Sequence, residues 1–183
     1  LMFDYIYHEH FNYFTTKSLL RILSNINFKI IDAEVNSFKG SSLRIIATNK
    51  TNNKLMIKKK NINKLINSEN VLKLNNKLYY DLFISKVNYQ KIVVNKFLSK
   101  YKNKKIFGFG ASHSTTTLIH HFNLEVYLSY IIDDNKLKNF TYSPHFKIPV
   151  IHTSLLSKFK PDIIVILAWQ HKKNILKQNI KIF

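Results

Sequence analysis

The chain has 183 residues, and 45% of them are hydrophobic, which is enough to bury a core and excludes wholesale disorder. It contains no cysteine, so disulfides and cysteine-ligated zinc are excluded within these residues, which fits a cytoplasmic protein. The net charge of +19 comes from lysines spread along nearly every segment, without a nucleic-acid-binding motif, so we expect no nucleic-acid partner. The longest apolar run, residues 163–169, is far below the roughly 20 residues that span a bilayer, so we expect no membrane partner.

The first part of the chain predicts one helix and a pair of strands. The expected elements are the end of a strand that runs into a loop (1–14), a helix (15–27) and two strands (28–35 and 41–47). The two strands resemble an antiparallel pair, and the loop between them holds Gly40, one of three glycines in the chain. Gly40 therefore indicates either a tight turn or a ligand site.

The middle of the chain predicts a connector. Residues 50–64 are polar, rich in lysine and weakly patterned, as is typical of a boundary. Apolar residues then recur every three or four positions over residues 65–101, which indicates one long helix or two shorter ones.

The last part of the chain alternates between strand and helix patterns. The expected strands are 104–107, 126–132 and 163–167, and the expected helices are 115–121 and 154–159. This alternation predicts an α/β fold with a parallel, Rossmann-like sheet.

A glycine-rich turn, Gly108-Phe109-Gly110, joins the first of these strands to the next helix. Such a turn exposes backbone amides and a positive helix end, which can hold a phosphate group. Asp133, about 20 residues further on, stands where such folds often bind a ribose hydroxyl. A complete dinucleotide fingerprint would need a small residue at His113, so we do not expect NAD. The alternative is a tight turn without a ligand, with Asp133 as a loop cap.

The sequence Tyr7-His8-Glu9-His10 groups a phenol, two imidazoles and a carboxylate. A histidine, which ordinarily titrates near pH ~6.5, can take a proton, a carboxylate can stabilise the resulting cation, and a tyrosine can donate to an oxyanion. This set suits removal of a proton next to a carbonyl, provided that a turn brings the side chains together. Two alternatives stay open: a metal site that uses His8 and His10, and histidines that are simply buried and satisfied.

Three stretches together resemble S-adenosylmethionine-dependent sugar C-methyltransferases. The first is residues 3–14 around Tyr7-His8-Glu9-His10, and the second is residues 38–44, with Gly40-Ser41-Ser42-Leu43-Arg44. The third is similar to the C-terminal nucleotide-sugar domain of that family and comprises residues 107–111, 132–135, 143–144, 148–149 and 167–169. The resemblance covers nearly the whole chain, in the family's order.

The resemblance implies three regions. Residues 1–48 would be the last helix and strands of a class I methyltransferase catalytic domain. Residues 49–64 would be a linker. Residues 65–183 would be a long helix followed by the C-methyltransferase C-terminal domain, Rossmann-like and α/β.

The resemblance also implies a reaction and a site. The family methylates carbon 3 of a nucleotide-linked 4-keto sugar with S-adenosylmethionine. His10 would be the base, Glu9 would assist it, and Tyr7 would lie at the keto sugar. The residues expected to bind the substrate are His8, Gly40, Gly108, Gly110, Ala111, Ser112, Ser114, Asp133, Asp134 and Pro144. No metal ligand is expected.

Several family features are missing from the sequence. The zinc module and the glycine-rich methyl-donor loop at the N-terminal side are absent, and residue 1 is leucine. A lysine-glycine pair common in the family is absent near His113 and Ser114. We therefore expect a C-terminal fragment of the enzyme that is inactive without its N-terminal half, with a methyl-donor site that lies mostly outside these residues. That half would be encoded either in the intact gene or separately, in an adjacent reading frame. The alternative is a non-catalytic nucleotide-sugar-binding module or a remnant.

Overall fold

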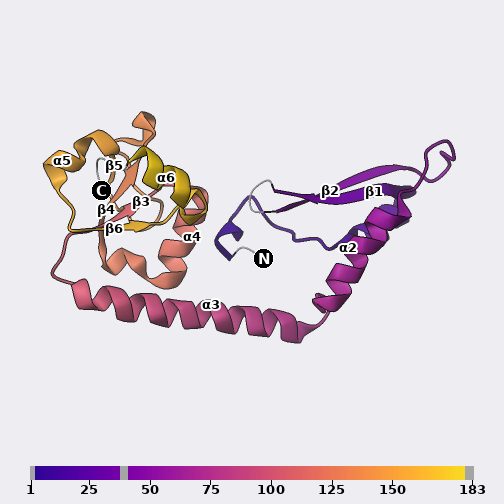
Figure 1. Ribbon diagram of the computed structural model, residues 1–183, viewed down its shortest axis with the longest axis horizontal. Coiled ribbons are helices and arrows are strands. Elements are labelled where there is room, and N and C mark those ends of the chain that lie inside the picture. Colours follow the sequence, from indigo (N-terminus) through magenta and orange to yellow (C-terminus); the bar gives the residue numbers. More distant parts are fainter. Residues whose placement is uncertain (1–2, 38–40, 180–183) are drawn as a thin grey trace. The chain divides into compact units, whose positions relative to one another are not determined.

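The computed structural model describes residues 3–37 and 41–179 and has an α/β architecture (Figure 1). The chain forms two compact units. The sheet unit comprises Leu1–Phe11 and Val87–Phe183, and the hairpin unit comprises Asn12–Lys86. The short segment that carries Tyr7-His8-Glu9-His10 therefore belongs to the sheet unit, although the sequence placed it with residues 12–48.

The hairpin unit packs two helices on a two-stranded antiparallel sheet. Its elements are helix α1 (Thr16–Asn25), strands β1 (Phe28–Asn36) and β2 (Ser42–Asn49), helix α2 (Lys59–Val71) and the first part of helix α3 (Lys77–Leu98). Thr15 and Ser18 form a reciprocal capping box that starts α1. Ile30, Ala33 and Ile62 form the buried core of this unit. The expected helix and antiparallel strand pair are thus present.

The structure differs from the sequence expectation at the linker. Helix α2 begins within residues 49–64, and Ile62 is buried against β1. The long helical pattern over residues 65–101 divides into α2 and α3, with Lys73 between them in the left-handed region at φ 52°. Gly40 lies outside the described residues.

The sheet unit contains a four-stranded parallel sheet flanked by helices. Its strands are β3 (Ile106–Phe109), β4 (Leu128–Asp133), β5 (Val150–His152) and β6 (Ile163–Ile166). Its helices are the second part of α3, α4 (His113–Phe122), α5 (Leu156–Phe159) and α6 (Lys172–Gln178). One buried cluster includes Leu98, Ile106 and Ile119, and a second includes Phe107 and Ile175. The parallel sheet expected from the sequence is confirmed.

The strand order β5-β4-β3-β6 creates a topological switch point. After β3 the chain adds β4 and β5 on one side, and β6 then pairs on the other side of β3. In open parallel sheets, ligands bind beyond the carboxyl ends of the two strands at such a point. Here those ends are held together, because the Leu167 and Ala168 amides both donate to the Phe109 carbonyl at 2.9 and 3.1 Å.

Residues 3–14 contain no strand, unlike the sequence expectation. Phe3–Tyr5 form a 3-10 turn, and the His10 amide donates to the Tyr7 carbonyl at 2.9 Å. The turn that an acid-base cluster requires is therefore present. Among residues 3–37 and 41–179, no helix has the length and apolar character needed to cross a bilayer.

Candidate functional site

The N-terminal segment lies along one face of helix α4. The Phe3 ring packs on His121 with centroids 4.4 Å apart, and the Thr117 hydroxyl donates to the Ile6 carbonyl at 2.8 Å. The Tyr7 ring stacks on His113 at 5.6 Å with an interplanar angle of 15°. The three helix positions are four residues apart and so share one face. The segment thus runs from the end of α4 to its start and places Tyr7 at the start of α4, beside the switch point.

A buried carboxylate fixes the same segment to the loop after β6. Asp4 is 2% exposed, and its Oδ2 accepts from Trp169 Nε1 at 2.9 Å and from Gln170 Nε2 at 3.3 Å. The Tyr5 hydroxyl donates to Gln170 Oε1 at 3.1 Å. Trp169 and Gln170 belong to the 3-10 turn Trp169–His171 directly after the switch point. Sequence analysis did not single out Asp4 or Gln170, because 165 residues separate the partners.

The contacts of His10 determine which nitrogen is basic. Its Nδ1 lies 3.1 Å from the Tyr5 carbonyl oxygen, which can only accept. Nδ1 must therefore carry the proton, and the basic lone pair is on Nε2. The Tyr7 ring lies 4.6 Å from the His10 ring, centroid to centroid. The structure thus brings the predicted base and the predicted phenol together.

Glu9 and His8 lie on the outer side of this turn. Glu9 Oε1 is 4.0 Å from His8 Nε2, and the two side chains are 56% and 76% exposed. The contact that orients His10 in the structure comes from the Tyr5 carbonyl. His8 also approaches His113 edge-on at 6.3 Å.

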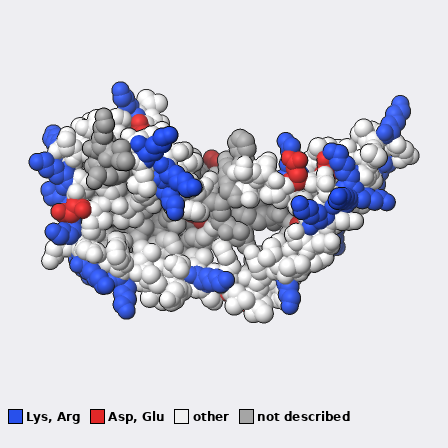
Figure 2. All heavy atoms as spheres, in the orientation of Figure 1, with Lys and Arg blue, Asp and Glu red and all other residues white. Residues whose placement is uncertain are grey.

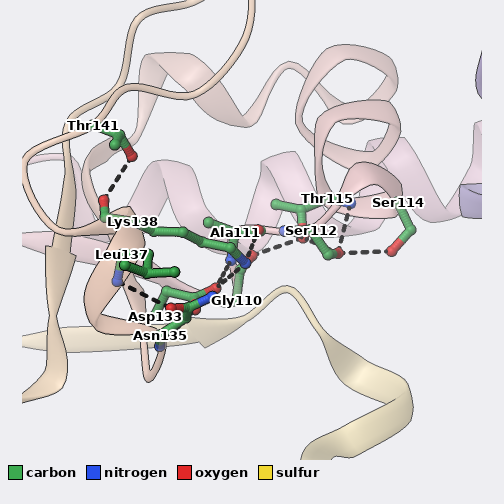
Figure 3. A network of polar contacts seen from close by, with 10 residues as sticks. All are labelled: Gly110, Ala111, Ser112, Ser114, Thr115, Asp133, Asn135, Leu137, Lys138 and Thr141. Atoms are coloured by element: carbon green, nitrogen blue, oxygen red, sulfur yellow. Dashed lines mark hydrogen bonds and ion pairs between the residues drawn. The ribbon is translucent and has the colours of Figure 1, made fainter.

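The turn between β3 and α4 is held by a polar network that Figure 3 shows. Ser112 caps α4 and forms a capping box with Thr115, whose hydroxyl donates to the Gly110 carbonyl at 2.7 Å. Asp133 Oδ2 accepts from the Ala111 amide at 2.8 Å and from Lys138 Nζ at 3.0 Å. Asp133 therefore serves the protein's own backbone, which is the loop-cap alternative that the sequence left open.

Lys138 supplies a positive charge at this turn. Its Nζ donates to the Ala111 carbonyl at 2.7 Å as well as to Asp133, and its side chain is 39% exposed. Sequence analysis missed it because it comes from a separate 3-10 turn, Lys136–Lys138, and carries no motif.

Both glycines of the turn have a packing reason. A Cβ on Gly108 would overlap the Leu167 side chain, and one on Gly110 would overlap the Ala168 methyl group. Gly110 also has φ +103°, which side chains rarely adopt. The two glycines thus allow the loop after β6 to approach strand β3 closely.

A small pocket of about 90 Å³ opens at the switch point. It is lined by Asp4, Tyr5, Ser112, Ser114, Trp169 and Gln170, among others. A larger groove of about 780 Å³ lies between α5, α6 and the outer side of β6, and no residue predicted for the site lines it. The small pocket is the better candidate because Asp4 and Tyr5, shortly before the first predicted motif, line it together with Ser112 and Ser114 after the glycine-rich turn.

Other predicted residues lie apart from this pocket. Asp134 is exposed on the loop after β4. Pro144 belongs to a loop whose Phe146 ring stacks on His120, in the last turn of α4, whereas Ser112 caps the start of that helix. Within residues 3–37 and 41–179, no group of three histidine, aspartate or glutamate side chains is arranged to hold a metal ion.

Comparison with protein families identifies the C-terminal part of the chain. The model of the C-methyltransferase C-terminal domain family matches residues 37–183, which is more than half of the chain. No curated protein matches the sequence. The matched range includes the switch-point turn, the capped helix α4 and the Trp169 loop. The chain therefore belongs to the family defined by the C-methyltransferase C-terminal domain.

Proposed function

We propose that this chain is the substrate-binding and proton-abstracting part of a C-methyltransferase that acts on a nucleotide-linked keto-deoxysugar. The observation that carries the proposal is the hydrogen bond from His10 Nδ1 to the Tyr5 carbonyl, because it puts a basic lone pair on Nε2 beside the Tyr7 phenol. Both groups lie on the sheet unit, next to a pocket at the switch point.

Proton removal uses these two side chains in complementary roles. His10 Nε2 takes the proton from the carbon next to the ketone, and the electron pair of that C–H bond moves to the carbonyl oxygen, which becomes an enolate. The Tyr7 hydroxyl donates a hydrogen bond to the enolate oxygen. Glu9, on the same turn, has the assisting role that the family resemblance gives it.

The nucleotide phosphates are assigned to the start of α4. Ser112 and Ser114 line the small pocket, their hydroxyl oxygens are 3.0 Å apart, and the positive end of the helix lies beside them. Lys138 adds a positive charge at the same turn. Lysines are otherwise dispersed over the face that Figure 2 shows and form no single patch there, which favours a small anionic ligand over a nucleic acid.

The described residues do not fit S-adenosylmethionine. Only the turn after β3 has the strand-glycine-helix form within the part that the structure describes, and there the glycine Cβ positions are filled by Leu167 and Ala168. The acidic residue that could bind a ribose, Asp133, already accepts from Ala111, Asn135 and Lys138. We therefore assign the methyl donor to a separately encoded N-terminal half and derive no step through it.

The hairpin unit provides a surface for such a half. Its sheet has only two strands, which is marginal without further packing. Val35 and Ile46, which lie on opposite faces of this sheet, are 54% and 46% exposed. An additional protein layer on either face would cover one of these apolar side chains.

Calorimetry with a nucleoside-diphosphate keto-sugar tests the binding part of the proposal. Ser114→Ala removes one hydroxyl from the pocket and should weaken binding by about tenfold or more, since a hydrogen bond to a charged group contributes roughly 1.5–3 kcal/mol. Ser157→Ala, in the larger groove, is the matched control and should leave the affinity unchanged. Loss of affinity in the control alone would place the ligand in the larger groove and contradict the proposal.

Methyl transfer reconstituted with a donor-binding half tests the catalytic part. His10→Ala should abolish the turnover while calorimetry still detects the nucleotide-sugar. An unchanged turnover in this variant would show that the base has been assigned wrongly.

A second candidate is a non-catalytic nucleotide-sugar-binding module. It is favoured by the exposure of Glu9 and His8, which leaves that side of the motif open to water. Binding of the nucleotide-sugar without any proton removal would identify this function.

A further inference from the structure

Asp4 is a buried carboxylate for which the proposed chemistry has no use. It lies 2% exposed, six residues before His10. Burial of a carboxylate is unfavourable unless hydrogen bonds compensate it, and here Trp169 Nε1 and Gln170 Nε2 both donate to its Oδ2. Packing alone does not explain a carboxylate at this position, because an apolar side chain would fill the same space without the cost of burying a charge.

The contacts of the segment fall on two independent elements of the sheet unit. On one side, α4 receives Phe3, Ile6 and Tyr7 through stacking and one hydrogen bond. On the other side, Asp4 and Tyr5 bind the loop after β6 through hydrogen bonds to Trp169 and Gln170. Since Tyr5 also supplies the carbonyl that orients His10, a contact that fixes residues 4 and 5 also fixes the imidazole.

We propose that Asp4 is a positioning residue that latches the base-bearing segment to the Trp169–Gln170 loop. Through this latch the base and the nucleotide-sugar pocket belong to one body, the sheet unit, although the chain leaves that unit directly after the motif, at Phe11. The effect of Asp4 on the rate of proton removal rests on the proposed function. Its role in holding the segment to the loop rests on the contacts alone. The base then stays with the substrate, whatever the position of the hairpin unit.

The latch has a specific kinetic consequence. Ser112 and Ser114 are held by α4 and its capping box, not by Asp4, so nucleotide-sugar binding should survive loss of the latch. Proton removal should not, because a displacement of the base by about 1 Å costs on the order of 10²-fold in rate. Asp4 also lines the small pocket, so Asp4→Ala should lower the rate by a larger factor than it raises the dissociation constant.

The test uses the full chain and three variants. Asp4→Ala removes the acceptor, Asp4→Asn keeps an acceptor of the same shape, and Trp169→Phe removes one donor while keeping a ring. Two quantities are measured for each: hydrogen exchange of the amides of residues 3–10 without ligand, and the rate at which a nucleoside-diphosphate 4-keto sugar exchanges its carbon-3 proton with deuterium in D₂O. Calorimetry with the same sugar gives the dissociation constant.

The proposal expects faster amide exchange in Asp4→Ala and Trp169→Phe, by tenfold or more. Deuterium incorporation should fall by a factor between 10 and about 100, more than the dissociation constant rises, with most of the loss restored in Asp4→Asn. Unchanged amide exchange in Asp4→Ala and Trp169→Phe would overturn the latch. Parallel loss of binding and incorporation in all three variants would show a purely structural role and also overturn it.

These outcomes separate the latch from the proposed function. If the unmodified chain incorporates no deuterium, the proposed function fails and amide exchange alone decides the latch. If the unmodified chain incorporates deuterium and Asp4→Ala does so at the same rate, the proposed function stands and the positioning role is wrong.

Discussion

Replacement of Gly110 by alanine distinguishes a glycine required by packing from a glycine required by a ligand. The residue has φ +103°, and a Cβ would overlap the Ala168 methyl group and lie 3.1 Å from the Ala168 backbone nitrogen. A side chain in that backbone region costs roughly 1–3 kcal/mol. Ala168 has no rotamer that could move its methyl group away, so overpacking adds about 1–3 kcal/mol. We expect Gly110→Ala to lower the free energy of unfolding by roughly 2–6 kcal/mol.

Denaturant unfolding followed by tryptophan fluorescence measures this loss. Trp169 is the single tryptophan of the chain and follows Ala168 directly, so its signal reports the sheet unit. In Gly110→Ala the denaturant concentration at the midpoint of unfolding should fall, while the dependence of the unfolding free energy on denaturant concentration should stay constant. The double variant Gly110→Ala, Ala168→Gly removes the opposing methyl group and should recover the packing part of the loss, with the backbone part remaining.

A small effect would refute the packing explanation. If Gly110→Ala lowered the free energy of unfolding by less than about 0.5 kcal/mol, the space beside Gly110 would be open, as a ligand cradle requires. If the double variant recovered nothing, Ala168 would not be the opposing group.

Three further predictions concern titration and hydrogen bonding. Burial, followed by the nearby positive charges of Lys91 and His120, lowers the pKa of His121. The neutral His121 ring therefore supports the packed Phe3 ring fully above pH 6.5, and this support is lost as the pH falls. Amide hydrogen exchange of residues 3–7 should accelerate toward pH 5 in the unmodified chain and not in His121→Phe. Hydrogen bonds from Lys58 and Asn61 lower the pKa of Asp32. The ionised Asp32 therefore stabilises the hairpin unit fully above pH 3.8, and this stabilisation is lost as the pH falls below that value. Asp32→Ala should lower the melting temperature measured by circular dichroism at pH 7. Thr115→Val leaves the glycine carbonyl of the β3–α4 turn without its donor and should cost about 1–3 kcal/mol in the same fluorescence assay, whereas Thr116→Val, on the next position of α4, should cost less.

The parallel sheet was predictable because its strands are short, apolar and separated by polar turns. Strand β5 was missed because it has only three residues, Val150–His152, after a proline-containing loop. Helix α6 was missed because Ile175 is its one buried residue, which leaves little periodic signal. Both elements depend on neighbours that the local sequence does not reveal.

The residue types of the candidate site could be identified from the sequence, but the contacts that hold them in place could not. Tyr7 and His10 were found because a phenol, imidazoles and a carboxylate in four residues are unusual in any structural context. The segment that carries them is fixed through Asp4 and Tyr5, whose partners Trp169 and Gln170 lie 165 positions away, so no spacing rule connects them. His113 was noted only as a departure from the dinucleotide fingerprint and from the family pattern, although its ring stacks on Tyr7.

The glycine-rich turn shows how one pattern fits two explanations. From the sequence, Gly108 and Gly110 indicated close approach of a phosphate group. In the structure they allow close approach of the protein's own chain at Leu167 and Ala168. Only the position of β6 beside β3 distinguishes these cases, and strand order is a tertiary property.

Deuterium incorporation at carbon 3 of a nucleotide-linked 4-keto sugar tests the proposed function most directly. The unmodified chain in D₂O should incorporate deuterium faster than buffer does, without a methyl donor. His10→Asn, whose side-chain amide can keep a donor at the position of Nδ1 but has no basic nitrogen, should reduce incorporation to the buffer rate. Incorporation by His10→Asn at the rate of the unmodified chain would contradict the assignment of the base.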